Sequence, residues 1–344
     1  MEHFSWKNYK INDVFNILKQ HQTQYIKKNK IFSELVESFQ NDLVPVINLE
    51  KIDIFCPKNQ KIIYNLFFLQ RGCLIFKNLY SPNLMNQFNL WCSSILEAVK
   101  NDKNCTHPKQ KDKWLINDLI KRLVNDKPEM LIDILFDNKL NQIMDIILGF
   151  GTFGSATGHW INPGGKRQLS HVDYPIHVGS GAFWEHSVNK LKRLSTQHQI
   201  NNILPHFSFQ LLIAADKMDI SNGSTEVVPC SHLLPDMDLI IHNPKIYSQF
   251  EEHFMNVTLE QGDLLIFNRR LCHRGGENIS DFRRNALIIQ SVYLWGVGQE
   301  IIDSSYIINK LEQNQKYLDF SEDKKKDIKL RLKKPYPIDV KNSA

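Results

Sequence analysis

The stretch GDLLIFNRRLCHRGGENIS (262–280) places a short apolar run of β type, LLIF, between turns that contain Gly and Asn. Similar runs recur from about residue 155 onward, namely ATGHWIN, LSHVDY, HFSFQLLIAAD, STEVVP, NVTLEQGDLLIF and RRNALIIQSVYLW. Many short strands separated by such turns are typical of an antiparallel sandwich or barrel. The sequence therefore predicts a mainly β core over about 155–297, with helices flanking it (α+β).

The composition is that of an ordinary globular protein. Of 344 residues, 42% are hydrophobic and 23% are charged, so a sizeable core can form. The net charge of +5 is spread along the chain, and we expect no nucleic-acid partner. The six cysteines form no CxxC pair and are interpreted as reduced thiols. Because no secretory signal or membrane-spanning run is recognisable, we expect a cytoplasmic protein without a membrane partner.

The chain is expected to fold as one catalytic domain with an extension. Residues 1–50 form the extension, which the apolar spacing predicts to be helical, and residues 51–344 form the domain. Within the domain, the polar segment 182–205 lacks a strand pattern. We interpret it as an insertion that forms a lid or a pocket wall.

Helix and strand signals precede the β region. One helix should end near Gly72, the run CLIF that follows should be a strand, and Ser81-Pro82 should begin the next helix. Further helices are expected at 113–125, at 129–149 and in the tail 303–344.

A histidine and a carboxylate stand two residues apart in the run SHVDYP (170–175). His171 and Asp173 share one face of a strand, because side chains alternate with a period of two. We propose His273, at the end of another predicted strand, as a third ligand. Two His and one carboxylate leave coordination positions open, as a non-haem Fe(II) oxygenase requires. A structural zinc site would instead fill all four positions, typically with Cys.

Arg284 begins the last strand of the β region, RNALIIQSVY. If the face that it shares with Ile288 looks into the barrel, a buried guanidinium needs a carboxylate partner. The distal carboxylate of 2-oxoglutarate would provide a bidentate pair, which Arg suits better than Lys. The alternative is a surface arginine at the start of a strand.

Four motifs in order resemble the signature of the phytanoyl-CoA dioxygenase family: HVD (171–173), NGSTEVVPCSH (222–232), GDLLIFNRRLCHRGGENIS (262–280) and Arg284. One departure is Cys230, which stands where the family usually has Gly. The resemblance covers about 155–297 and extends more loosely to 60–100. It implies a double-stranded β-helix, a jelly-roll (cupin-like) barrel, with Fe(II) as cofactor and 2-oxoglutarate and O₂ as co-substrates.

The resemblance also implies roles for particular residues. His171, Asp173 and His273 resemble the iron ligands, and Arg284 resembles the residue that binds 2-oxoglutarate. We interpret His159 and His232 as structural. Further candidates for the 2-oxoglutarate site are Thr225, Ser291 and Gln210, and those for the substrate pocket are Trp160, His177 and Trp184.

The family chemistry would release succinate and CO₂ and oxidise an unactivated C–H bond of a small molecule. Hydroxylation, desaturation and oxidative cyclisation all remain open, whereas the carboxylate of Asp173 disfavours halogenation. Lys190, Lys192 and Arg193 in the insertion favour an anionic substrate such as a carboxylate, an amino-acid derivative or an acyl-CoA. The last residues, KNSA, do not form a peroxisomal address of the SKL type.

Two other functions fit a barrel of this kind. One is a binding module that keeps the fold without the chemistry, and the other is a cupin-type hydrolase that uses zinc or another metal in place of iron. Neither of them needs Arg284 inside the barrel. Stabilisation of the protein by 2-oxoglutarate would therefore separate both from the oxygenase. The sequence does not predict an oligomeric state.

Overall fold

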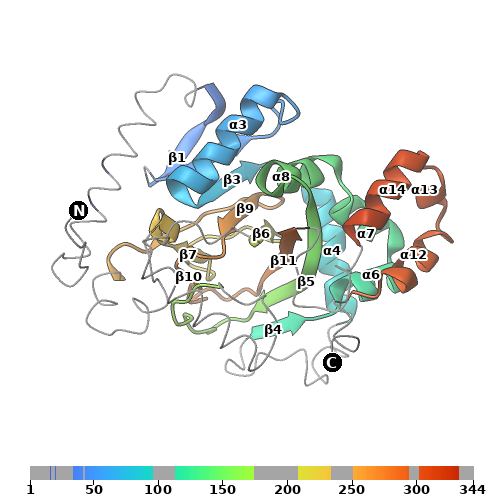
Figure 1. The fold of residues 1–344 in the computed structure, drawn as a ribbon. Coiled ribbons are helices and arrows are strands. Elements are labelled where there is room, and N and C mark those ends of the chain that lie inside the picture. The colour runs from blue at the N-terminus through green and yellow to red at the C-terminus, as the bar shows by residue number, and fades with distance from the viewer. Residues whose placement is uncertain are drawn as a thin grey trace, which may run out of the picture.

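The structure is a computed structural model and describes residues 16, 20, 34–41, 43–95, 113–173, 208–233, 251–293 and 302–332. Its centre is an eight-stranded sheet with the strand order β1-β2-β3-β9-β6-β11-β5-β4 (Figure 1). Neighbouring strands run antiparallel except β2 and β3, which are parallel. The strands are β1 (Ser38–Gln40), β2 (Val44–Asn48), β3 (Cys73–Lys77), β4 (Lys113–Ile116), β5 (Gly151–Ile161), β6 (Ser208–Ala214), β9 (Leu264–Asn268) and β11 (Arg284–Tyr293).

A second, smaller sheet has the order β10-β7-β8. It consists of β10 (His273–Gly275), β7 (Thr225–Val227) and β8 (Met255–Asn256), and all its pairings are antiparallel. Along the chain, β7 and β8 of the small sheet lie between β6 and β9 of the large one, and β10 lies between β9 and β11, so the chain passes repeatedly from one sheet to the other, as in a double-stranded β-helix. The predicted mainly β core with flanking helices is confirmed.

The two faces of the large sheet are covered differently. On β9, Leu264 and Ile266 belong to a large core shared with the helices, whereas Leu265 and Phe267 belong to a smaller core that includes Val227 of the second sheet. The alternation follows from the period of two along a strand. We call these the outer and the inner face. The site described below lies on the inner face.

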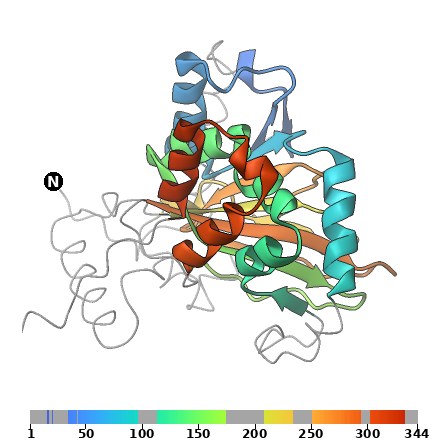
Figure 2. The same cartoon turned by 90° about the vertical axis from the view of Figure 1, so that its right-hand side faces the viewer.

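Helices cover the outer face of the sheet (Figure 2). Those before the β region are α3 (Pro57–Asn65), the π-helix η2 (Leu66–Arg71), α4 (Pro82–Ser94), α6 (Leu119–Asp126), α7 (Pro128–Leu135) and α8 (Asn138–Leu148). Those after it are α12 (Ser304–Leu311), α13 (Gln315–Leu318) and α14 (Glu322–Arg331), and a short 3₁₀ turn, η3 (Ser231–Leu233), follows β7. None of the described helices is long and apolar enough to cross a membrane.

Several local signals act as the sequence predicts. The π-helix ends at Gly72, whose φ of 74° is a left-handed conformation that glycine adopts easily. Ser81 accepts a hydrogen bond from the Leu84 amide and caps α4, which begins at Pro82.

Two segments differ from the prediction. Residues 38–48, expected in the helical extension, form β1 and β2, and β2 pairs with β3 of the main sheet. The start of the helix expected at 113–125 is instead the strand β4, which pairs with β5. In both places the pairing partner is distant in sequence, so tertiary contacts override the local pattern. The insertion 182–205 lies outside the described residues.

Candidate active site

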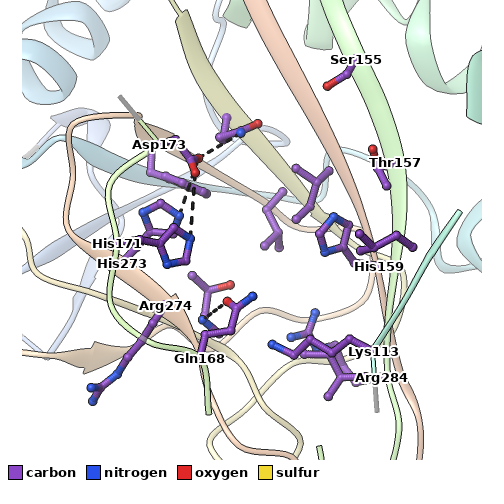
Figure 3. Close-up of a pocket in the computed structure, with 18 of the residues that line it drawn as sticks. Lys113, Ser155, Thr157, His159, Gln168, His171, Asp173, His273, Arg274 and Arg284 are labelled. Atoms are coloured by element: carbon purple, nitrogen blue, oxygen red, sulfur yellow. Dashed lines mark hydrogen bonds and ion pairs between the residues drawn. The ribbon is translucent and has the colours of Figure 1, made fainter. Parts of the chain in front are cut away.

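His171, Asp173 and His273 meet on the inner face, where their possible ligand atoms all lie within 4.8 Å of one another (Figure 3). An isolated antiparallel bridge joins the two histidines: each backbone N–H donates to the carbonyl of the other residue at 3.0 Å. The Asp173 amide donates to the Arg269 carbonyl at 2.9 Å. The backbone thus brings the predicted HxD pair beside the strand that carries His273.

Both histidines are held in the same tautomer. Nδ1 of His171 lies 2.9 Å from the Leu169 carbonyl, and Nδ1 of His273 lies 2.9 Å from the Leu271 carbonyl. Because a carbonyl can only accept, each Nδ1 carries the proton and each Nε2 offers a lone pair. Burial lowers the pKa of His273 to about 4, so this ring is neutral at physiological pH, as a metal ligand must be.

The carboxylate of Asp173 completes the donor set. Its Oδ1 lies 4.0 Å from Nε2 of His171, and its Oδ2 lies 3.7 Å from Nε2 of His273. Burial acts to raise the pKa of Asp173, but the neighbouring His273 and Arg269 and the amide of Gln210 outweigh burial and lower it. One carboxylate and two imidazoles, each with its Nδ1 beside a backbone carbonyl, fit the donor set of non-haem iron.

Two buried cations lie at the other end of the same pocket, Arg284 at the start of β11 and Lys113 on β4 (Figure 3). Each residue is only 3% exposed. Burial, opposed by Asp216, lowers the pKa of Arg284 to about 10. Burial and then the charge of Arg284 lower the pKa of Lys113 to about 7. No described carboxylate forms an ion pair with either residue, so this end of the pocket fits an incoming carboxylate.

The turn Asn222-Gly223 orients Arg284. Nη2 of Arg284 donates to the Gly223 carbonyl, while its buried Nε has no hydrogen-bond acceptor among the described residues. Gly223 has a φ of 81°, and a Cβ there would lie 3.1 Å from the Gly276 carbonyl oxygen. This position therefore requires glycine, and the turn fixes one side of the guanidinium while its Nε remains available.

Gly275 makes room for two polar side chains on the pocket floor. The Gln168 amide oxygen accepts a hydrogen bond from the Gly275 N–H at 2.6 Å. A Cβ on Gly275 would lie 2.7 Å from that oxygen and 3.0 Å from Nζ of Lys113. Gln168 lies between the three metal-ligand candidates and the two cations (Figure 3).

The pocket as a whole has a cavity volume of about 370 Å³. Its wall on β5 is polar and carries Ser155, Thr157 and His159 on alternate positions, whereas Leu212, Phe267 and Ile288 supply apolar contacts. The cavity has the size of a small-molecule site, and most of the residues that line it are polar or charged.

A model of the family described as phytanoyl-CoA dioxygenase (PhyH) matches residues 68–286, which is more than half of the chain. The chain belongs to the phytanoyl-CoA dioxygenase family. This match confirms the predicted family.

Two curated dioxygenases are similar to parts of this chain at less than 30% sequence identity. The dioxygenase lolE1 of Epichloe uncinata is 29% identical over 130 residues, which is 37% of this chain and 41% of lolE1. The dioxygenase cdmD of Talaromyces verruculosus is 26% identical over 161 residues, 45% of each chain. This chain thus spans less than half of either curated relative.

Among solved structures, the non-haem α-ketoglutarate-dependent epimerase SnoN from nogalamycin biosynthesis is similar in fold. Its TM-score is 0.53 at 14% sequence identity, and the match covers 70% of this chain and 83% of SnoN.

Of the remaining site candidates, the structure places some in the pocket and others away from it. Thr225 and Gln210 line the pocket, and Gln210 donates to Oδ2 of Asp173 at 3.0 Å. Ser291 does not line it: it stands an odd number of residues after Arg284, so its side chain faces the outer side, near Thr152. Trp160 likewise packs in the outer core against Trp114. His177 and Trp184 lie outside the described residues.

The two histidines interpreted as structural differ from each other. His232 is buried, and its Nε2 lies 3.0 Å from the Phe68 carbonyl, in keeping with a structural role. His159 instead lines the pocket, because it lies on the face of β5 opposite to Trp160. The predictions for Trp160 and His159 assumed that the opposite set of β5 side chains faces the pocket.

Several residues of the site were not predicted, among them Lys113, Gln168, Arg269 and Gly275. Lys113 carried one signal, since Lys113, Leu115 and Asn117 alternate within KWLIN, as expected of a strand with a polar inner edge. Gln168 and Gly275 carried no signal apart from lying close in sequence to the metal-ligand candidates.

Proposed function

We propose that this protein is an Fe(II)- and 2-oxoglutarate-dependent dioxygenase that oxidises an unactivated C–H bond of a small, anionic metabolite and releases succinate and CO₂. The observation that carries this proposal is the joint presence, in one cavity, of a His-Asp-His donor set and two buried basic residues with which no carboxylate of the described residues forms an ion pair. A metal-dependent hydrolase or a binding module would not require those cations.

In this proposal His171, Asp173 and His273 bind Fe(II). The bound iron, together with 2-oxoglutarate and O₂, supplies the oxidising chemistry, whereas the protein supplies binding, orientation and exclusion of water. The carbonyls of Leu169 and Leu271 keep each Nδ1 protonated, so both Nε2 atoms stay directed at the metal position.

Arg284 and Lys113 then bind the distal carboxylate of 2-oxoglutarate. The Nε of Arg284 offers a buried donor, and the ammonium group of Lys113 contributes a second charge. Thr225 lies in the same lining and is positioned to add a hydroxyl. Because the metal-ligand candidates lie at one end of the pocket and the two basic residues at the other, the co-substrate would bind with its chelating end at the metal (Figure 3).

The substrate occupies the remaining space along β5. Ser155, Thr157 and His159 offer hydrogen-bonding groups, and the basic residues of the segment 182–205 favour an anion. Hydroxylation is the simplest outcome, and desaturation or cyclisation would require the substrate carbon to be held farther from the metal. The likeness to SnoN, which acts in nogalamycin biosynthesis, supports a role in secondary metabolism.

The decisive experiment is a visible spectrum of the anaerobic protein with Fe(II) and 2-oxoglutarate. We expect a metal-to-ligand charge-transfer band, because 2-oxoglutarate chelates ferrous iron held by such a donor set. His273→Ala should abolish the band by removing a ligand, and Arg284→Ala should raise the concentration of 2-oxoglutarate needed to develop it. Bound Fe(II) without a band in the unmodified protein would refute the proposal. Succinate release in a screen of anionic and neutral metabolites would then identify the substrate class.

A further inference from the structure

We propose that Gln210 and Arg269 are positioning residues that hold one oxygen of Asp173 and thereby keep this carboxylate a monodentate ligand. The inference rests on the proposed function, because it concerns how the iron ligands leave room for the co-substrate. Sequence reasoning placed Gln210 in the 2-oxoglutarate site, but the structure gives it a different contact.

Gln210 is fixed by the sheet around it. It lies on β6, which pairs with β9 on one side and with β11 on the other, and it is 7% exposed. Its Nε2 donates to Oδ2 of Asp173 at 3.0 Å. Since β6 is paired on both sides, the sheet holds the backbone of Gln210, and burial restricts the movement of its amide.

Arg269 holds the same oxygen by its charge. Its Nε lies 3.8 Å from Oδ2 of Asp173, and the residue is 1% exposed. Its carbonyl also accepts the Asp173 amide proton, so backbone and side chain both tie Asp173 to the segment that leads into His273. An ion pair at this burial is only weakly screened by solvent.

Both contacts are made to Oδ2, which also lies 3.7 Å from Nε2 of His273, and we therefore assign Oδ1 as the metal-ligand atom. Oδ1 of Asp173 accepts no hydrogen bond from the described residues and lies 4.0 Å from Nε2 of His171. A monodentate carboxylate and two imidazoles leave three positions of an octahedral ion open. A bidentate carboxylate would take one of these, and a chelating co-substrate and O₂ could then not both bind.

The test compares Fe(II) and 2-oxoglutarate binding in Gln210→Met, which keeps the volume of the side chain but removes the donor. Gln261→Ala is the matched control, since its amide also donates two hydrogen bonds, to Asn86 and to the Ala215 carbonyl, outside the pocket. Anaerobic calorimetry gives the Kd of Fe(II), and titration of the visible band gives the Kd of 2-oxoglutarate. We expect both constants to rise roughly tenfold in Gln210→Met, with a weaker or shifted band, and to stay unchanged in the control.

Arg269 is tested in the same way. Arg269→Lys should retain most of the 2-oxoglutarate affinity, because it keeps the positive charge, whereas Arg269→Met should lose it as Gln210→Met does. Thermal unfolding shows whether each variant is folded. Should Gln210→Met not fold, Gln210→Asn keeps a buried amide that is too short to reach Asp173, and it should show the same losses.

The outcomes distinguish this inference from the proposed function. A band in the unmodified protein, together with unchanged constants and an unchanged band in folded Gln210→Met or Gln210→Asn, overturns the role of Gln210 alone. Equal losses in Arg269→Lys and Arg269→Met overturn the role given to the charge. Absence of the band from the unmodified protein refutes the proposed function itself.

Discussion

At the scale of single residues, Lys113 is the group whose chemistry is most altered by its surroundings. Its ammonium is buried beside Arg284, and its pKa is lowered to about 7 by burial and by that neighbouring charge. A carboxylate bound between the two would favour the charged form and raise the pKa again. Binding of the co-substrate and protonation of Lys113 are therefore coupled.

This coupling predicts a pH dependence of 2-oxoglutarate affinity. Above the pKa of about 7, Lys113 is neutral in the free protein, so binding must take up a proton and the affinity falls as pH rises. We expect a loss on the order of tenfold between about pH 6 and about pH 8.5, measured anaerobically by titration of the visible band. Lys113→Met should bind more weakly and show little pH dependence. A parallel fall in Lys113→Met would assign the effect to another group.

Gly275 offers a second test at the same scale. In Gly275→Ala the new methyl would displace the ends of two flexible side chains, Gln168 and Lys113, and not the backbone. We therefore expect a loss of stability of about 1 kcal/mol but a rise in the Kd of 2-oxoglutarate of roughly tenfold. Urea unfolding and co-substrate titration measure the two effects. Unchanged co-substrate affinity would show that neither side chain contributes to the site.

At the scale of elements, tight turns determine where the strands of the large sheet begin. The turn before β9 contains Gly262, whose φ is 91° and whose added Cβ would lie 2.1 Å from the Tyr80 carbonyl oxygen. The Tyr80 amide also donates to the Gly262 carbonyl. This close contact joins the segment after β3 to the start of β9.

The contrast with Gly164 separates the effect of the close contact from that of backbone strain. Gly164 has a φ of 76°, but nothing lies within 4 Å of the Cβ it would gain. We expect Gly164→Ala to reduce the free energy of unfolding by about 1 kcal/mol, and Gly262→Ala by at least about 3 kcal/mol, because only the latter must also move backbone. Urea unfolding of both variants measures the difference. Equal losses of unfolding free energy in the two variants would mean that the positive φ alone determines the destabilisation.

The arrangement of the strands also explains which residues of the site could be predicted from the sequence. His171, Asp173, His273 and Arg284 could be proposed from motifs in the sequence, and the structure brings them into one pocket, while their roles stay predictions. Trp160 was misplaced because the sequence does not show which face of β5 looks inward. The contact of Gln210 with Asp173 could not be predicted either, since it depends on β6 lying between β9 and β11 in the sheet.

At the scale of the whole molecule, the C-terminal helices are tied to the sheet through Arg331. This residue is 3% exposed, donates to both carboxylate oxygens of Asp145, and also reaches Asp327 and the Gly151 carbonyl. It therefore joins α14 to α8 and to the first residue of β5. The helical layer and the strand that lines the pocket share this anchor.

Removal of the anchor should destabilise the protein as a unit. Arg331→Ala leaves Asp145 without its buried partner, and we expect a loss of about 3 kcal/mol in the free energy of unfolding. Lys329→Ala on the same helix is the control: its pair with Glu312 is exposed, and we expect no measurable change in the free energy of unfolding. Urea unfolding gives both values, and hydrogen exchange should rise over 302–332 only in Arg331→Ala. Equal stability of the two variants would show that the helices are held by apolar packing alone.

The shortness of β10 has a consequence for how this site can change in evolution. Its three residues have three different roles. His273 is a metal-ligand candidate, and the buried guanidinium of Arg274 pairs with Glu226. Gly275 leaves room for the side chains of Gln168 and Lys113. An insertion or deletion of one residue in this strand would disturb all three at once. New substrate preferences are therefore expected to arise by change along β5 and in the loops, while β10 remains fixed in length.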